Sequence, residues 1–200
     1  HDEVSNVTIA AGAVAEEPQI SGDQYVGGIM GTMMASDIED SVSNAYVSGD
    51  THVGGMVGLI YVTGENSNGI SNSSATGEVF GYLRVGGLVG TAVNDESNGV
   101  EYVISDSSAT GQVTGSGQAG GFIGDNGGAE IYNSYATGDV VAVACECGPI
   151  GGFVGRQASE NGLDGYIHES FATGSVDPED SGVWYSGSFV GEMDGGIIEN

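Results

Sequence analysis

"SYATGDV" (residues 134–140) and "GGFVG" (residues 151–155) are two short words that recur along the whole chain. The second word begins at residues 27, 54, 86, 120 and 151, with a degenerate copy, "GSFVG", at 187; successive copies are 27, 32, 34, 31 and 36 residues apart. The first word precedes each copy, as "ISGD" (20–23), "YVSGD" (46–50), "SATGEV" (74–79), "SATGQV" (108–113), "YATGDV" (135–140) and "FATGSV" (171–176). Six linked copies identify a repeat protein.

The first word alternates as a strand does. Ser134, Ala136, Gly138 and Val140 share one face, and the other copies agree closely on these small residues. The residues between them vary, apart from a recurrent threonine. Small residues facing inward and variable residues facing outward are typical of a tightly wound coil, whose inner faces crowd together.

The second word predicts a strand that is covered on both sides. In "VGGLVG" (85–90) both faces of the strand carry only apolar side chains or glycine. A phosphate-binding loop would need a following helix, and none is indicated. Polar loops with Asn-Gly or Asp-Gly pairs follow the word, and a short Ile/Val strand leads to the next copy. Each period therefore contains about three short strands. We expect an all-β protein, a β-solenoid of about six imperfect coils of 27–36 residues, with no significant helix.

The repeats divide the chain into three parts. Residues 1–20 form an N-terminal strand or tail, residues 21–191 the six-copy solenoid, and residues 192–200 the start of an incomplete seventh coil. "AAGAV" (10–14) resembles "ATGDV", so one copy's N-terminal strand could complete the last coil of another. The open ends of a solenoid are sheet edges that must be capped, covered or used. The alternative is that the chain is a slice of a longer array.

The charge is strongly one-sided. The chain has 28 acidic residues and two basic ones, Arg84 and Arg156, giving a formal net charge of −26. Such a surface cannot neutralise phosphates and is repelled by anionic membranes, which excludes nucleic acid as a natural partner. No apolar run is long enough to predict membrane insertion. Apolar residues make up 39% of the chain, enough to build a core. Lysine-free acidic surfaces require screening or bridging by cations, so a high-salt or calcium-rich exterior is expected.

"VGGLVG" joined to "NSSATG" and "NSYATG" resembles the GLUG-motif repeat family. The resemblance covers nearly the whole chain. It implies a bacterial or archaeal surface protein, an adhesin, or a non-catalytic part of a secreted peptidase, displayed outside the cell. It carries no catalytic residues. The "GSFVG" copy and the short first connectors depart from the pattern.

Acidic loops are the first candidate site. If these loops stack, neighbouring carboxylates lie close together, and calcium, which prefers oxygen ligands, would relieve their repulsion. If calcium does not bind, the acidic loops form a solvated surface that is adapted to high salt. The candidate calcium ligands are Asp95, Glu96, Asp125, Glu160, Asp164, Glu192 and Asp194.

Two further kinds of covalent site are indicated. Cys145 and Cys147 in "CEC" could form a strained local disulfide if the chain turns there; a crosslink to another chain and free thiols are the alternatives. Sequons place candidate glycosylation sites at Asn6 and Asn72.

We expect an extracellular structural repeat protein, such as a filament subunit, a surface stalk or an adhesin segment, that could assemble head-to-tail by strand complementation. The alternative is a carbohydrate-binding adhesive module that contacts cell-surface glycans through exposed aromatic side chains. No Ser-His-Asp or His-Glu-x-x-His arrangement is present, so we expect no enzyme and no cofactor other than calcium. The candidate glycan contacts are Tyr135, Phe171, Trp184 and Tyr185, and Tyr25 and Tyr82 are further aromatic residues expected to be exposed.

Overall fold

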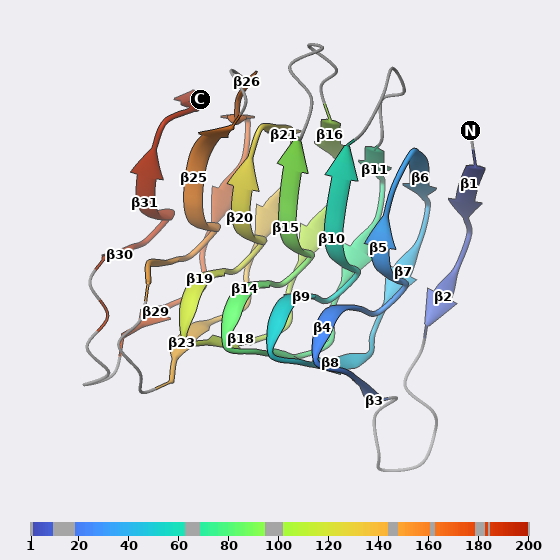
Figure 1. Cartoon of the computed structure of the whole chain (residues 1–200), viewed down its shortest axis with the longest axis horizontal. Coiled ribbons are helices and arrows are strands. Elements are labelled where there is room, and N and C mark those ends of the chain that lie inside the picture. Colours follow the sequence, from blue (N-terminus) through green and yellow to red (C-terminus); the bar gives the residue numbers. More distant parts are fainter. Residues whose placement is uncertain are drawn as a thin grey trace.

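The computed structural model describes residues 2–9, 19–62, 69–94, 102–143, 148–160, 163–178, 183 and 185–199. Within these ranges the protein is all-β, and its strands stack in parallel as a β-solenoid (Figure 1). No described segment is a helix of the length and apolarity needed to cross a bilayer. The prediction of a helix-free solenoid is confirmed.

One coil of the solenoid contains five strands, and each strand pairs with its equivalents in the coils on either side (Figure 1). Coils 1 to 6 span residues 2–33, 36–62, 69–94, 102–127, 129–160 and 166–194. We name the five resulting sheets A to E in the order in which a coil visits them. Sheet A consists of β1 (Asp2–Ser5), β6 (Ser36–Glu39), β11 (Gly69–Ser71), β16 (Tyr102–Ser105), β21 (Ala129–Tyr132), β27 (Tyr166–His168) and β32 (Ile197–Glu199).

Sheets B and C continue the coil with short strands. Sheet B consists of β2 (Thr8–Ile9), β7 (Val42–Ser43), β12 (Ser74–Ala75), β17 (Ser108–Ala109), β22 (Tyr135–Ala136) and β28 (Phe171–Ala172). Sheet C consists of β3 (Gln19–Ser21), β8 (Tyr46–Ser48), β13 (Val79–Phe80), β18 (Val113–Gly115), β23 (Val140–Ala142) and β29 (Val176–Asp177).

Sheets D and E complete the coil. Sheet D consists of β4 (Gln24–Gly27), β9 (Thr51–Gly54), β14 (Leu83–Gly86), β19 (Gly117–Gly120), β24 (Ile150–Gly151) and β30 (Ser186–Gly187). Sheet E consists of β5 (Met30–Met33), β10 (Val57–Val62), β15 (Val89–Asn94), β20 (Ile123–Gly127), β25 (Val154–Glu160) and β31 (Val190–Asp194), with β26 (Leu163–Asp164) added antiparallel to β25.

Each repeated word bends around a corner, so a coil has five strands instead of the three expected. "SYATGDV" leaves sheet B after Ala136 and enters sheet C at Val140, and its inward residues are buried as predicted. A Cβ on Gly138 would lie 1.9 Å from the carbonyl oxygen of Gly111 in the coil below. Glycine therefore occupies this corner in coils 3 to 6, because adjacent coils approach too closely there for a side chain.

The strand register corrects the sequence reading of the first two coils. Val79 pairs with Val47, and Phe80 pairs with Ser48, so Gly81 is the neighbour of Gly49. "YVSGD" is thus not a copy of "SATGEV", because its glycine lies one corner further along the coil. The position equivalent to Gly77 is occupied by Ala45, whose carbonyl oxygen lies under Gly77. Both sequences contain Gly followed by an acidic residue, which hid the difference.

A ladder of buried serines joins the coils between sheets A and B. The Ser73 amide donates to Ser107 Oγ at 3.2 Å, and Ser107 Oγ donates to the Ser105 carbonyl at 2.7 Å. Equivalent pairs of bonds recur at Ser41, Ser134 and Ser170, and the residues linked in this way are 27 to 36 positions apart. The ladder gives buried backbone amides a partner and confirms the predicted range of coil lengths.

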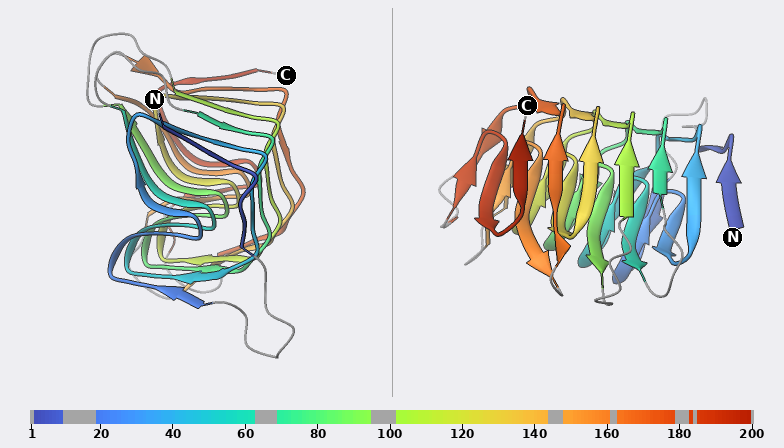
Figure 2. Two further views of the ribbon diagram at one scale, coloured as in Figure 1. Left: turned by 90° about the vertical axis from the view of Figure 1, so that its right-hand side faces the viewer. Right: turned by 90° about the horizontal axis from the view of Figure 1, so that it is seen from above.

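Two apolar cores run the length of the stack. The first core lies inside sheets A, B and E and contains large side chains such as Ile104, Leu88 and Phe153. The second core lies between sheets C and D and consists of valine and alanine with a single isoleucine, Ile150. Seen along the stack, the coil narrows between two lobes (Figure 2, left).

The narrowing is where the two words meet. A Cβ on Gly87 would lie 2.1 Å from the Gly121 carbonyl oxygen and 2.9 Å from Ala109 Cβ. The second glycine of "GGLVG" therefore packs against the alanine of "SATG" in the next coil. This contact explains why the two words occur together: each leaves room for the other.

The two ends of the described chain also join the stack. Of residues 1–20, strands β1 and β2 pair in parallel with β6 and β7 of coil 2. Strand β32 pairs with β27 as the first strand of a seventh coil (Figure 2, right). The "AAGAV" segment lies outside the described residues.

Candidate functional site

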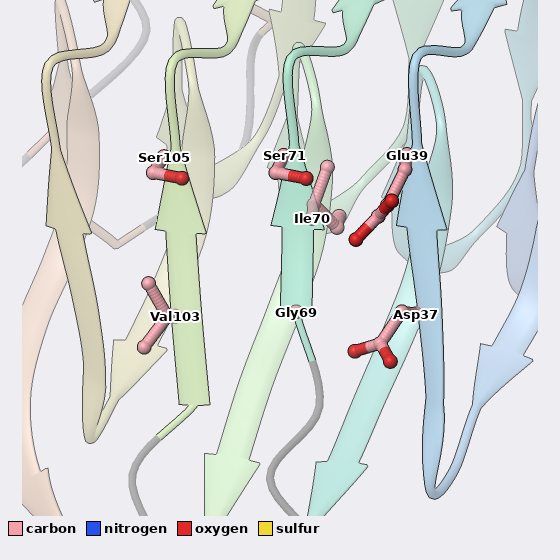
Figure 3. A pocket seen from close by; sticks show the side chains of 7 residues that line it. All are labelled: Asp37, Glu39, Gly69, Ile70, Ser71, Val103 and Ser105. Atoms are coloured by element: carbon pink, nitrogen blue, oxygen red, sulfur yellow. The ribbon is translucent and has the colours of Figure 1, made fainter. Parts of the chain in front are cut away.

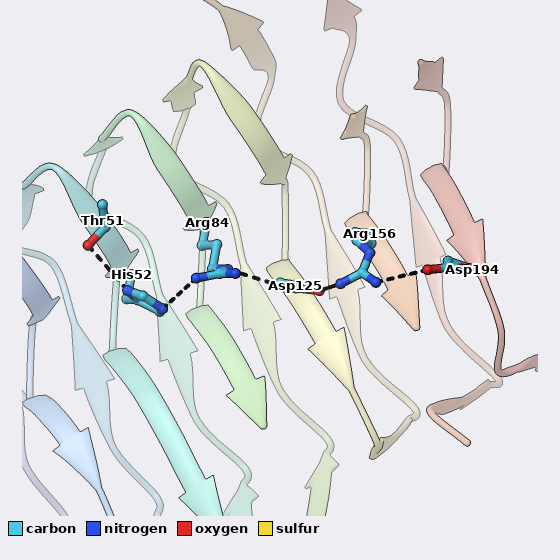
Figure 4. A network of polar contacts seen from close by, with 6 residues as sticks. All are labelled: Thr51, His52, Arg84, Asp125, Arg156 and Asp194. Atoms are coloured by element: carbon cyan, nitrogen blue, oxygen red, sulfur yellow. Dashed lines mark hydrogen bonds and ion pairs between the residues drawn. The ribbon is translucent and has the colours of Figure 1, made fainter. Parts of the chain in front are cut away.

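The two arginines of the chain meet at one buried carboxylate. Asp125, on β20 in sheet E, is 3% exposed. Its Oδ2 lies 3.3 Å from Arg84 Nε, and its Oδ1 lies 3.5 Å from Arg156 Nη1 (Figure 4). Arg156 Nη2 also donates to Asp194 at 2.9 Å. These ion pairs tie coils 3 to 6 together.

Burial raises the pKa of Asp125 above its usual value, and the two arginines act in the opposite direction. Removing one partner of such a buried pair would leave an uncompensated charge, which is costly. The arrangement commits both cations of the chain to neutralising a buried acid and spanning neighbouring coils.

His52 extends this network on the side of coil 2. Its Nε2 lies 3.1 Å from Arg84 Nη1, and its Nδ1 lies 3.2 Å from Thr51 Oγ1 (Figure 4). A guanidinium can only donate, so Nε2 must accept and the proton resides on Nδ1. Burial, together with the charge of Arg84, lowers the pKa of His52 from 6.5 to about 4. The ring is therefore neutral at physiological pH.

Of the seven candidate calcium ligands, Asp125, Asp164, Glu192 and Asp194 have described side chains. Asp125 and Asp194 contact arginines, and Glu192 pairs in register with Arg156. Asp164 accepts a hydrogen bond from Ser159 Oγ. Asp95 and Glu96 lie outside the described residues, as does the side chain of Glu160. In the described part of the chain, no group of three His, Cys, Asp or Glu side chains could hold a metal ion. Calcium binding stays a prediction.

A shallow hollow of about 220 Å³ lies on sheet A, where Gly69 has no side chain. Asp37 and Glu39 on β6 point across it toward β11 (Figure 3). Burial raises the pKa of Asp37, and the charge of Glu3 acts in the same direction. Sequence reasoning missed this pair because Gly69 reads only as part of a turn.

The exposed aromatic candidates are split between sheets. Tyr135 and Phe171 lie on adjacent strands of sheet B, with stacked rings whose centroids are 5.3 Å apart and whose planes differ by 8°. Tyr185 is exposed and precedes β30 in sheet D. Trp184 lies outside the described residues.

The glycosylation candidates lie on a left-handed corner between sheets A and B. Asn6 and Asn72 have φ values of 56° and 48°, a region that asparagine tolerates better than most residues. Both side chains are exposed, and the Asn72 amide donates to Asp40 of the neighbouring coil. Cys145 and Cys147 lie outside the described residues, so their pairing stays a prediction.

The parallel stacking of short strands from successive coils defines the class of the protein as a β-solenoid repeat protein. The family model described as the GLUG motif matches residues 115–141. Gly115 pairs in register with Ala142, so the matched segment is one complete circuit of the solenoid. The expected resemblance to GLUG repeats is confirmed in that segment. No curated protein and no solved structure matches the chain.

Proposed function

We propose that the chain is a structural repeat segment of an extracellular or cell-surface protein. The observation that carries the proposal is the in-register parallel stacking of five sheets through all six coils. Such a stack is a quasi-one-dimensional rod in which each coil contacts its neighbours, so length can be added without changing the cross-section. The GLUG motif is compatible with this role.

The internal columns make the rod stiff. The serine ladder links successive coils through buried hydrogen bonds, and Phe122, Phe153 and Phe189 stack along the first core with centroids 4.6 and 4.9 Å apart. Asp125, the one acidic side chain that is buried in the described part of the chain, is held by two arginines. These features support a scaffold in preference to an enzyme.

The location can be tested on intact cells of the source organism. Antibodies raised against the purified chain should label unpermeabilised cells, and external protease should remove the signal. A cytoplasmic protein serves as the control for lysis. Labelling only after permeabilisation would overturn the proposed location.

We propose that the rod operates in high salt or in calcium. Its net charge of −26 destabilises the folded state through self-repulsion, which salt screens within about 3 Å at 1 M. The midpoint of thermal unfolding should rise with sodium chloride. A further rise with calcium chloride at matched ionic strength would show specific binding. A midpoint that is unchanged in both salts would contradict the proposal.

Head-to-tail assembly is a more specific version of the structural role proposed above. Strand β32 shows that sheet A can be extended beyond coil 6 in the same parallel register. We propose that a strand from a second copy can continue the stack in the same way. Electron microscopy of the purified chain, in high salt with calcium and in low salt with a chelator, tests this. Filaments would support it, and discrete short rods in every condition would overturn it.

A second function, carbohydrate binding, is favoured by the stacked Tyr135 and Phe171, whose side chains are 37% and 52% exposed. Flat exposed aromatic pairs offer apolar faces to a ligand. A glycan array probed with the wild-type chain tests this function.

A further inference from the structure

A second hollow, of about 500 Å³, opens where sheets C and D meet in coils 1 to 3. Its lining comes from β3, β8 and β13 of sheet C and from the turns that lead from these strands into sheet D. Its volume falls in the range of about 300–1,000 Å³ typical of small-molecule sites. It shares none of the contacts of the arginine network.

The hollow results from the register that the sequence reading missed. "SGD" occurs at residues 21–23 and 48–50, and the equivalent residues of coil 3 are "FGY" at 80–82. The Asp50 amide donates to the Asp23 carbonyl at 2.9 Å, and the Tyr82 amide donates to the Asp50 carbonyl at 3.0 Å, which places the three residues in one column. Small side chains in coils 1 and 2 therefore lie beside bulky ones in coil 3.

The step between these coils is an aromatic wall. The rings of Phe80 and Tyr82 are 5.8 Å apart and inclined at 76°, and Tyr82 is 53% exposed. Tyr46, on the strand next to Phe80, contributes a third ring to the lining. The wall thus offers apolar ring surface to a ligand that lies over coils 1 and 2.

The lining contributed by coils 1 and 2 is largely polar, apart from Tyr46. Asp23 and Asp50 are exposed, and Ser21 and Ser48 also line the hollow. Carboxylates accept hydrogen bonds, and hydroxyls both donate and accept. A pyranose ring matches this arrangement because it has apolar C–H faces and a rim of hydroxyl groups.

Charge narrows the class of sugar. A chain with a net charge of −26 and two carboxylates in the hollow repels uronic acids, sulfated sugars and sialic acid. Calcium takes six to eight oxygen ligands, and the hollow contains two carboxylates. A neutral sugar is not repelled by the carboxylates and, unlike calcium, does not need six to eight oxygen ligands.

We propose that this hollow is a binding site for a neutral oligosaccharide, with Tyr82 and Phe80 stacking against the sugar and Asp23 and Asp50 accepting bonds from its hydroxyls. The inference rests on the second function proposed above and gives that function a site and a class of ligand. Among the described aromatic residues that the sequence indicated as exposed, Tyr82 lines the hollow and the others do not.

The experiment is calorimetric titration of the whole chain with neutral hexasaccharides of glucose, mannose and N-acetylglucosamine, and with a galacturonate hexamer as the anionic control. At least one neutral sugar should bind and the galacturonate should not. Tyr82→Ala should weaken binding about tenfold or more, and Tyr82→Phe should retain it, since the aromatic face is kept. Asp50→Asn should weaken binding several-fold.

Control variants distinguish binding in this hollow from carbohydrate binding elsewhere on the chain. Met34→Ala removes an exposed apolar side chain that does not line the hollow and should leave the affinity unchanged. Tyr135→Ala tests the exposed ring pair on sheet B as the competing sugar surface. Ser48→Phe should block the hollow, and the neighbouring strand β13 already has phenylalanine at the equivalent position, Phe80. This variant keeps the test valid if Tyr82→Ala fails to fold.

Three results would overturn the proposal in different ways. Binding that is lost in Tyr135→Ala and kept in both Tyr82→Ala and Ser48→Phe would preserve carbohydrate binding but move the site to sheet B. Failure of every neutral sugar to bind would remove this site and the carbohydrate function, while leaving the structural role to the cell-surface test. If the chain binds calcium in the absence of sugar, and Asp50→Asn abolishes that binding, the hollow is a cation site instead.

Discussion

The two cores of the solenoid differ in the size of their side chains, although the same coils enclose both. The first core holds isoleucine, leucine, methionine and aromatic side chains beside valine and alanine, and the second holds valine and alanine with one isoleucine. Columns of glycine separate them, because backbones of neighbouring coils approach closely there. The difference shows that a coil can narrow without losing its register, provided that the side chains on each side of the glycine column differ in size.

The largest effect should come from the first core. Phe153 is fully buried between Phe122 and Phe189, and Phe153→Ala should lower the free energy of unfolding by about 3–5 kcal/mol. Val113→Ala in the second core should cost about 1.5–3 kcal/mol, since fewer methyl groups are removed. Chemical denaturation of both variants measures the difference. Equal losses would contradict the distinction between the cores.

A substitution in the glycine column should come next. The Cβ of Gly87→Ala would collide with the backbone of Gly121, which cannot move aside as a side chain could. We expect a loss of about 1–3 kcal/mol or more. Gly148→Ala is the matched control, because its Cβ would meet nothing nearer than 3.4 Å. If both variants unfold at the same temperature, close packing does not explain the glycine column.

Loss of one serine from the ladder should have a smaller effect. Ser107→Ala leaves the buried Ser73 amide without its acceptor, at a cost of about 1–3 kcal/mol. Ser74→Ala, on the partly exposed neighbouring position, should change stability by less than about 0.5 kcal/mol. Thermal unfolding of the two variants compares a buried hydroxyl with a surface one, and equal midpoints would argue against the ladder.

The smallest effect should be a pH dependence at His52. Its pKa is about 4 in the folded protein and 6.5 in an ordinary setting, so the unfolded chain takes up the proton first as the pH falls. The stability that depends on neutral His52 is complete above pH 6.5 and is lost between pH 6.5 and 4. His52→Gln removes this titration, and Gln118 already occupies the equivalent left-handed position. Wild type should therefore lose stability relative to the variant between pH 7 and 5. Parallel pH profiles would contradict the assignment.

Much of the solenoid could be predicted because repetition is visible in the letters themselves. The alternation of Ser134, Ala136, Gly138 and Val140 correctly identified the inward face, and the spacing of "GGFVG" correctly set the range of coil lengths. The corners were missed, since a strand that bends at a glycine keeps the same alternation of inward and outward residues.

The functional surfaces were harder to predict. "SGD" was taken for a copy of "ATGD", which hid the step between Asp50 and Tyr82. The calcium candidates were chosen by charge, and Asp125 was not recognised as the partner of Arg84 and Arg156. Neither the step nor the ion pairs could be derived from composition, because coil lengths vary and each shift in length changes which side chains become neighbours.

The sequence by itself determined that the chain repeats, that its strands bury small residues, and that its surface is acidic. These properties follow from local alternation and from counting charges. Only the tertiary structure decided which residues of different coils meet: Arg84 with Asp125, Gly87 with Ala109, and Asp50 with Tyr82. The physical reason is that backbone hydrogen bonds between coils set the register, and those bonds are independent of side-chain identity.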